Sequence, residues 1–156
     1  IRLMPNTPCL VGQGVTGLCL GAHATEEQAA WVTSLLSSVG EVIRLDETVM
    51  DTVTAVSGSG PAYVFYVMES LERAAIAGGL DPDTASRMVR QTILGAAELA
   101  KASDETPAVL RSQVTSPGGT TEAAIGVLDE ADVGQRFEQA VSAGVARGRQ
   151  LRERAS

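Results

Sequence analysis

Residues 116–121, with the sequence SPGGTT, have the types and spacing needed to hold a small anion. The apolar-periodic run over 122–128 follows directly, which predicts that a helix starts here. The first turn of a helix exposes unpaired N–H groups and a partial positive charge, and both favour a carboxylate or a phosphate. Flanking hydroxyls would add donors, and two glycines would leave room for the ligand.

The same six residues also suit an ordinary connection between two helices. Either Thr120 or Thr121 can serve as the N-cap, and proline and glycine are common at helix boundaries. Taken by itself, the composition of this segment favours the plain helix cap. The anion site is the alternative, and other features of the chain must decide between them.

Few residues elsewhere could carry out metal or acid–base chemistry. His23 is the only histidine, Lys101 is the only lysine, and Cys9 and Cys19 lack C-x-x-C spacing, so no metal site is predicted. Neither a Ser/His/Asp triad nor a pair of catalytic carboxylates can be assigned. If the protein is an enzyme, a cofactor is expected to supply the reactive chemistry and this chain the positioning.

Two further glycine-rich segments are interpreted as structural. Residues 12–17 (GQGVTG) match the dinucleotide pattern G-x-G-x-x-G, but a strand is predicted next and the following helix signal begins only at Thr25. A pyrophosphate there would meet no helix N-terminus, so dinucleotide binding is not predicted at this point. Residues 57–60 (SGSG) are predicted to form a second glycine-and-hydroxyl loop before a long helix.

Composition narrows the class of protein. The 156 residues are 44% hydrophobic and carry a formal net charge of −7, which argues against nucleic-acid binding. No apolar run approaches the ~20 residues that span a membrane, so a soluble, cytoplasmic protein is expected, with both cysteines as free buried thiols. Because the chain opens on Ile1 and Met4 lies inside an apolar segment, we interpret it as the back portion of a longer protein.

The elements that must position these residues follow from periodicity. Strands are predicted at 1–3, 15–20 and 41–45, and a helix is predicted from a Thr25–Gln28 capping box to Gly40. From Thr48 onward the pattern is helical, with helices expected at 48–56, 62–77 (Pro61 in the first position), 82–102, 107–114, 121–129 and 132–153.

The last of these helices has two notable features. Ala140, Gly144 and Gly148 recur every four residues, which predicts a smooth stripe for close packing of another helix. Four arginines gather near its C-terminal end, where cations oppose the helix macrodipole, and a solvated helix end is the favoured interpretation. They are Arg147, Arg149, Arg152 and Arg154.

Three motifs in order resemble the pyrroline-5-carboxylate reductase family: 2–8 (RLMPNTP), 55–63 (AVSGSGPAY) and 114–121 (VTSPGGTT). The likeness covers essentially the whole chain. It implies a mainly α fold: an all-helical dimerisation domain of the 6-phosphogluconate dehydrogenase C-terminal-like type at 47–156, preceded by a short α/β remnant of a Rossmann domain at 1–46.

The resemblance also implies a reaction. Members of the family reduce the cyclic imine 1-pyrroline-5-carboxylate to L-proline with NADPH or NADH, the last step of proline biosynthesis. Their dinucleotide fingerprint would lie upstream of residue 1, so this chain alone is expected to be inactive. A homodimer through the helical domain is implied, within a larger ring in some members, with a small-molecule substrate and neither nucleic acid nor membrane as partner.

The resemblance implies roles for individual residues of the third motif. Ser116, Thr120 and Thr121 would lie at the substrate carboxylate and ring nitrogen, with Gly118 and Gly119 allowing close approach. Thr121 is the expected catalytic residue, its hydroxyl contacting the nitrogen. Thr120 is often alanine in relatives, so its backbone N–H is the expected contact.

The resemblance places the other half of the site in the first motif. Met4, Pro5 and Asn6 match the family segment at the nicotinamide end of the cofactor. Two alternatives stay open. The chain could be a non-catalytic helical dimerisation module whose glycines serve only packing, or a related dehydrogenase acting on another imine or a hydroxy acid. The latter would need a lysine for proton transfer, and Lys101 lies in no recognisable motif.

Overall fold

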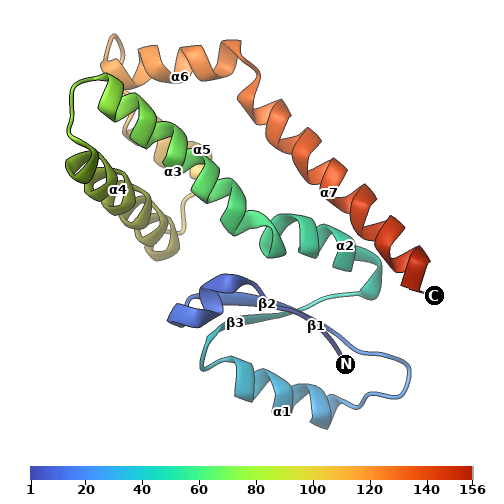
Figure 1. Ribbon diagram of the computed structural model, residues 1–156. Helices are drawn as coiled ribbons and strands as arrows, with labels where there is room; N and C mark the ends of the chain where they lie inside the picture. Colours follow the sequence, from blue (N-terminus) through green and yellow to red (C-terminus); the bar gives the residue numbers. More distant parts are fainter. Residues whose placement is uncertain (156) are drawn as a thin grey trace. The chain divides into compact units, whose positions relative to one another are not determined.

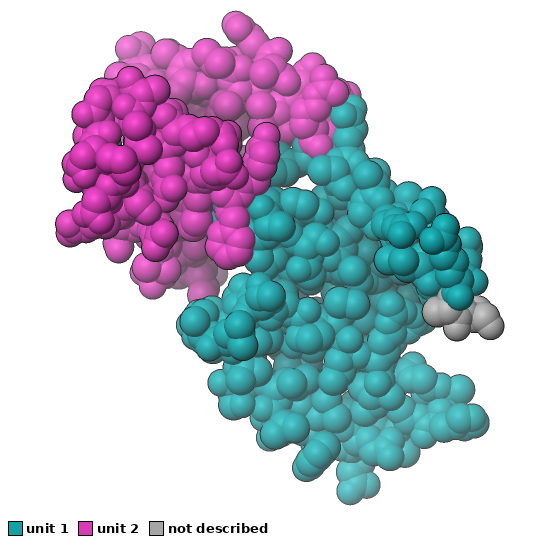
Figure 2. Space-filling model, viewed as in Figure 1, with its two compact units in different colours: residues 1–64, 137–156 teal, residues 65–136 magenta. Residues whose placement is uncertain are grey.

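The computed structural model describes residues 1–155, which are mainly helical with a small sheet near the N-terminus (Figure 1). This agrees with the expected fold class. The chain forms two compact units (Figure 2): unit 1 comprises residues 1–64 and the chain from Phe137 onward, and unit 2 comprises residues 65–136. The boundary between 46 and 47 predicted from sequence describes a different division, and it stays a prediction.

The sheet of unit 1 has three strands in the order β1 (Arg2–Met4), β2 (Gly14–Cys19) and β3 (Gly40–Arg44). β1 pairs with β2 in antiparallel fashion and β3 pairs with β2 in parallel fashion. Parallel neighbours need a crossover, which helix α1 (Glu26–Leu36) supplies between β2 and β3 (Figure 1). The three predicted strands are therefore confirmed, each within one residue at its ends.

The centre of this sheet is β2. Thr16, Leu18 and Cys19 are buried, with Leu18 only 1% exposed and opposite Leu3 in the antiparallel register. A central strand covered on its faces is expected to have such a run of buried residues. The core of unit 1 continues into Met50, which is fully buried.

Helix α1 begins as predicted and ends earlier. The Gln28 amide donates to Thr25 Oγ1 at 3.2 Å and the Thr25 amide donates to Gln28 Oε1 at 3.0 Å, so the capping box is confirmed. The helix ends at Leu36 rather than reaching Gly40, and the Ser37 hydroxyl donates to the Thr33 carbonyl at 2.8 Å where it ends.

Gly40 instead begins β3, beside Gly14 in the parallel register. Its φ is +154°, and a Cβ at this position would lie 2.1 Å from the Gly14 carbonyl oxygen. Gly14 is equally confined, because its own Cβ would lie 2.1 Å from Cys9 Sγ in the 3-10 helix Thr7–Val11. The two strands thus meet at a point where neither backbone has room for a side chain.

The predicted loop at 57–60 is wrong, because the chain stays helical there. A 3-10 turn (Glu47–Val49) leads into α2 (Met50–Val53), then a π-helical turn (Thr54–Gly58, the π-turn) and then α3 (Gly60–Ala77). The Ser59 amide donates to the Thr54 carbonyl at 2.9 Å, an i→i+5 bond. Gly58 and Gly60 both keep negative φ, so they do not make a turn.

Hydroxyl side chains explain why this sequence favours a π-turn over a break. Thr54 Oγ1 donates to the Met50 carbonyl and Ser57 Oγ donates to the Val53 carbonyl, both at 2.9 Å. Such back-bonding to the preceding turn bends a helix without ending it. Pro61 follows as the second residue of α3, where a missing N–H costs no hydrogen bond.

Helix α7 (Val133–Ala155) packs its glycine stripe within unit 1, as expected for two of the three small residues. A Cβ on Gly144 would lie 3.1 Å from Ala55 Cβ, and one on Gly148 would lie 3.5 Å from Asp51 Oδ1. Ala140 is exposed. Close approach of α7 to α2 and the π-turn therefore depends on Gly144 and Gly148.

The arginine cluster is not simply a solvated helix end, and this corrects the sequence interpretation. Asp51 is 6% exposed, and its Oδ2 lies 2.9 Å from Arg152 Nη2 and 3.9 Å from Arg149 Nε. A buried carboxylate needs such partners. These two arginines therefore fasten α7 to α2, across a long stretch of sequence.

Unit 2 contains the rest of α3, three complete helices and the first turn of α7. The complete helices are α4 (Pro82–Ala102), α5 (Pro107–Gln113) and α6 (Thr120–Glu130). Both predicted cap-then-proline signals are confirmed. Asp81 accepts from the Thr84 amide at 3.1 Å and Thr106 accepts from the Val109 amide at 3.4 Å.

Candidate functional site

The segment 116–121 forms a tight turn into α6. The Gly119 amide donates to the Ser116 carbonyl at 2.9 Å, and Gly118 has φ of +71°. Proline in the second position of a turn and a left-handed glycine in the third are the pattern of a type II turn. A Cβ on Gly119 would lie 2.9 Å from the Ser116 oxygen. Both glycines are thus required by the turn itself.

The predicted hydroxyl N-cap is wrong. Gly119 is the N-cap, with φ of −84° and ψ of 170°, and no side chain in the described part of the molecule caps α6. Thr120 and Thr121 lie in the first helical turn instead, because the chain becomes helical directly after the tight turn at Gly118 and Gly119. Their hydroxyls are therefore not used to satisfy the helix terminus.

The N-terminus of α6 presents a row of backbone donors. Its first helical bond runs from the Ala123 amide to the Gly119 carbonyl at 3.2 Å, so the N–H groups of Thr120, Thr121 and Glu122 precede it. The side chains of Ser116 and Thr120 are exposed and that of Thr121 is half-buried. Three hydroxyls and these N–H groups thus occur within seven residues, 116–122, as the anion-site interpretation requires.

One carboxylate already contacts this segment. Glu122 Oε2 accepts from the Gly118 amide at 2.8 Å. The bond is local and exposed, and a negative charge in the first turn is also favourable to the helix. It demonstrates that the Gly118 N–H has the direction and access to take a carboxylate oxygen.

The first motif, 4–6, lies in unit 1 at the end of β1. Met4 is half-buried and Pro5 exposed. Asn6 precedes the 3-10 helix without capping it, since its Oδ1 accepts from the Val15 amide at 2.9 Å and its Nδ2 donates to the Ser57 carbonyl at 3.2 Å. Residues 116–121 belong to unit 2, so the two parts of the predicted site are described separately.

A thiol, a carboxylate and a guanidinium form a cluster that sequence reasoning missed. Cys19 Sγ donates to Glu47 Oε2 at 2.8 Å, and Arg2 forms an ion pair with the other oxygen of Glu47. Burial, and then the bond to Glu47, raise the pKa of Cys19, and the bond from Cys19, followed by Arg2, lowers the pKa of Glu47. Cys19 is therefore a protonated structural donor, buried as predicted, whereas Cys9 is only half-buried.

We expect thiol labelling of the native chain to modify Cys9 at least about tenfold faster than Cys19, because the thiolate is the reactive form and burial disfavours it at Cys19. Since the folded state holds this proton more tightly, the associated stabilisation is complete below the ordinary thiol pKa and declines as pH rises through the higher folded value. Mass spectrometry of the labelled sites measures the two rates, and urea unfolding at neutral and alkaline pH measures the change in stability. Equal rates at the two cysteines would contradict the assignment.

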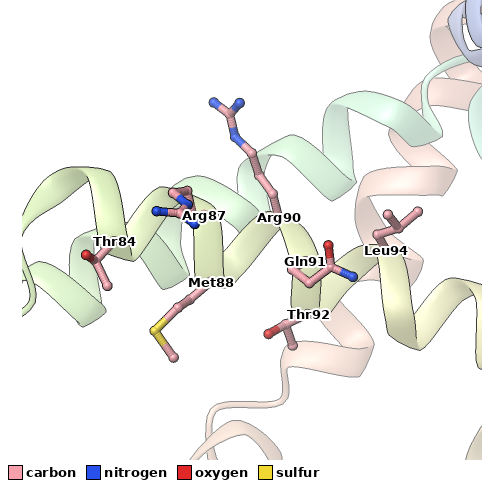
Figure 3. Close-up of a pocket in the computed structure, with 7 residues that line it drawn as sticks. All are labelled: Thr84, Arg87, Met88, Arg90, Gln91, Thr92 and Leu94. Carbon is pink, nitrogen blue, oxygen red and sulfur yellow. The ribbon is translucent and has the colours of Figure 1, made fainter.

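A hollow of about 770 Å³ runs along α4 in unit 2. Figure 3 shows that Thr84, Met88 and Thr92 project to one side of the helix, as their four-residue spacing requires. None of the predicted site residues lines it, and Met88 and Leu94 there are 55% and 51% exposed. The hollow is thus an open helix surface. Its lining residues are Thr84, Arg87, Met88, Arg90, Gln91, Thr92 and Leu94.

Within 1–155, His, Cys, Asp and Glu side chains form no group of three or more that could hold a metal ion. Over the same residues, every helix is too short or too polar to cross a membrane.

Comparison with known proteins gives concordant results. A family model described as pyrroline-5-carboxylate reductase dimerisation matches residues 47–151. Pyrroline-5-carboxylate reductase from Pseudomonas aeruginosa is 47% identical over 154 residues, covering 98% of this chain and 56% of the relative. The Arabidopsis thaliana enzyme of the same name is 42% identical over 151 residues, covering 97% and 55%. The chain thus spans about half the length of the curated relatives it matches.

Solved structures agree. A pyrroline-5-carboxylate reductase from Coxiella burnetii superposes with a TM-score of 0.92 at 42% identity, covering 96% of this chain and 56% of that one. Plasmodium falciparum pyrroline carboxylate reductase with NADP bound gives 0.90 at 34% identity, covering 96% and 61%. With the motifs, the fold and the matched domain in agreement, the chain belongs to the pyrroline-5-carboxylate reductase family.

Proposed function

We propose that this chain is part of an NADPH- or NADH-dependent reductase that converts 1-pyrroline-5-carboxylate to L-proline in the cytoplasm, the last step of proline biosynthesis. The observation that carries the proposal is the bond from the Gly118 N–H to a carboxylate oxygen of Glu122 at 2.8 Å. A substrate carboxylate bound there would displace the Glu122 side chain. Family membership supports the identity of the substrate, and all of the relatives named above are reductases of this class.

The chemistry asks mainly for positioning. A protonated cyclic imine accepts hydride at its C=N carbon without a strong base, and a bound nicotinamide supplies that hydride. Ser116 and the N–H groups at the start of α6 fix the substrate carboxylate, while the Thr121 hydroxyl contacts the ring nitrogen. Charge-assisted hydrogen bonds of this kind contribute about 1.5–3 kcal/mol each.

The first motif is suited to a nicotinamide ring. Met4 and Pro5 offer partly exposed apolar surface, and a Cβ at Gly60 would meet no atom within 4 Å, so space remains beside the start of α3 in unit 1. Met4 and Pro5 would hold the ring by apolar contact. Positioning both reactants in this way replaces acid–base catalysis as the main contribution of this chain.

The direct test is an assay of the complete protein that carries this sequence. We expect oxidation of NADPH or NADH that depends on 1-pyrroline-5-carboxylate, with L-proline identified by mass spectrometry, and no turnover by residues 1–156 alone. Titration of each cofactor decides the preference between them. A folded complete protein that forms no proline with either cofactor would reject the proposal.

A homodimer through the helical domain is the second part of the proposal. Unit 2 exposes large apolar side chains that a partner subunit would cover. The most exposed of them on α3 and α4 are Phe65, Tyr66, Met88, Leu94 and Leu99.

We expect Leu94→Glu to weaken self-association roughly thirtyfold or more, because it buries a charge in an apolar contact. Sedimentation across a dilution series measures the dissociation constant, and Asp104→Asn, in an exposed turn, is the matched control. A stable monomer of the unsubstituted chain contradicts the dimer. If the chain dimerises but the complete protein lacks reductase activity, the result would favour the interpretation as a non-catalytic dimerisation module.

A further inference from the structure

The Asn6 side chain joins three elements of unit 1. Its Oδ1 accepts from the Val15 amide in β2, and its Nδ2 donates to the carbonyl of Ser57, which is 51 residues away in sequence. A backbone N–H can pair only with the amide oxygen, so the bond from Val15 fixes the orientation of the amide group. Both polar ends of this side chain are therefore engaged by the protein itself.

The element that Asn6 holds is the π-turn. Met4, in the same segment as Asn6, lies against it as well, since a Cβ on Gly58 would be 3.6 Å from Met4 Sδ. The Tyr63 hydroxyl fastens the turn a second time by donating to the Ala55 carbonyl at 3.0 Å. Ala55 is only 1% exposed, so these contacts act on a confined backbone.

A π-turn is less favourable than a regular α-helix, and it persists where surrounding contacts impose it. Two contacts impose it here, one from the predicted cofactor segment and one from α3. The close approach of α7 adds a third contact, because a Cβ added at Gly144 would lie only 3.1 Å from Ala55 Cβ.

We propose that Asn6 is a positioning residue: it locks the π-turn against Met4 and so sets the shape of the nicotinamide end of the cofactor site. In this role its amide is not a contact to the cofactor, which changes the expectation drawn from the sequence motif. The part that concerns the cofactor rests on the proposed reductase function, whereas the locking of the π-turn does not.

The first experiment tests the lock by amide hydrogen exchange in the full chain. Asn6→Asp keeps an acceptor for Val15 and loses the donor to Ser57. We expect the Ser59 amide, whose bond to Thr54 defines the π-turn, to exchange at least about tenfold faster, with the Val15 amide still protected. Asn6→Ala should accelerate exchange of both the Ser59 and the Val15 amides. Thr7→Ala, a substitution at an exposed neighbouring position, should accelerate neither.

Tyr63→Phe removes one hydroxyl and keeps the ring, so it tests the same lock without touching Asn6. We expect the same acceleration at Ser59 and unchanged exchange of the Gly14 amide, which is bonded to the Val39 carbonyl and reports that the sheet of unit 1 is intact. Exchange of Ser59 at the unsubstituted rate in Asn6→Asp and in Tyr63→Phe would overturn the proposal.

The second experiment measures kinetics of the complete protein. We expect Asn6→Asp to raise the KM for the nicotinamide cofactor roughly tenfold, with the KM for the imine within about twofold, and Tyr63→Phe to act in the same direction. The double variant should lose less than the product of the two single losses, since both act through one element. Multiplicative losses, or no effect of Tyr63→Phe on the cofactor KM, would indicate direct contact by Asn6 and overturn the positioning role. If the unsubstituted protein shows no reductase activity, the proposed function fails, and the exchange results alone decide whether Asn6 holds the π-turn in place.

Discussion

Replacing Thr121 by valine in the complete protein is expected to lower kcat/KM for the cyclic imine by roughly ten- to a hundredfold. Valine keeps the shape of the side chain and removes only the hydroxyl proposed to contact the ring nitrogen. Loss of one charge-assisted hydrogen bond accounts for an effect of this size. Thr121 is half-buried in the first turn of α6, so the substitution leaves the backbone donors of that turn in place.

Three comparisons make the result specific. Thr121→Ser should recover most of the activity, since it restores a hydroxyl, and Thr121→Ala should resemble the valine variant. Thr48→Val, at an exposed position in the 3-10 turn before α2, is the matched control and should leave kcat/KM within about twofold. Thr121→Val with unchanged kinetics and an unchanged circular dichroism spectrum would remove Thr121 from the proposed mechanism.

Sequence reasoning located the start of α6 and the need for glycine before it, because both are local properties. The tight turn at Gly118 and the approach of Gly119 to Ser116 arise within four residues. The identity of the N-cap was not predictable, because Gly119, Thr120 and Thr121 are all acceptable at that position. The turn geometry decides among them, and no residue type in this segment encodes that choice uniquely.

In the rest of the fold, too, features set by neighbouring residues were predictable and features set by distant residues were not. The capping box at Thr25 and the cap-then-proline signal at Asp81 were predictable, since each depends on residues three positions apart. The π-turn was not, because besides the local hydroxyl bonds of Thr54 and Ser57 it is held by a bond from Asn6, which lies 51 residues before Ser57. Nor was the pairing of Asp51 with Arg152, which joins α2 to the far end of the chain. Contacts of this length carry no local periodic signal.

Replacing Gly40 by alanine is expected to lower the free energy of unfolding by about 3 kcal/mol, the largest stability effect that we predict. The φ of +154° at Gly40 is one that residues with a side chain rarely adopt. The added methyl group would also lie 2.1 Å from the Gly14 carbonyl oxygen, a backbone atom. Relief by movement is costly, because the Gly14 amide is bonded to the Val39 carbonyl at 3.0 Å and Gly14 is itself pressed against Cys9.

Urea unfolding followed by circular dichroism measures this change, and Gly21→Ala is the matched control in the same unit. A Cβ at Gly21 would meet no atom within 4 Å, so the free energy of unfolding of Gly21→Ala should differ from that of the unsubstituted chain by no more than about 0.5 kcal/mol. Equal midpoints for the two variants would mean that β2 and β3 can separate at little cost. The sheet that contains Met4, and to which Asn6 is bonded through the Val15 amide, would then be too compliant to hold the π-turn. The stability of the Gly14–Gly40 contact therefore also bears on the positioning role of Asn6.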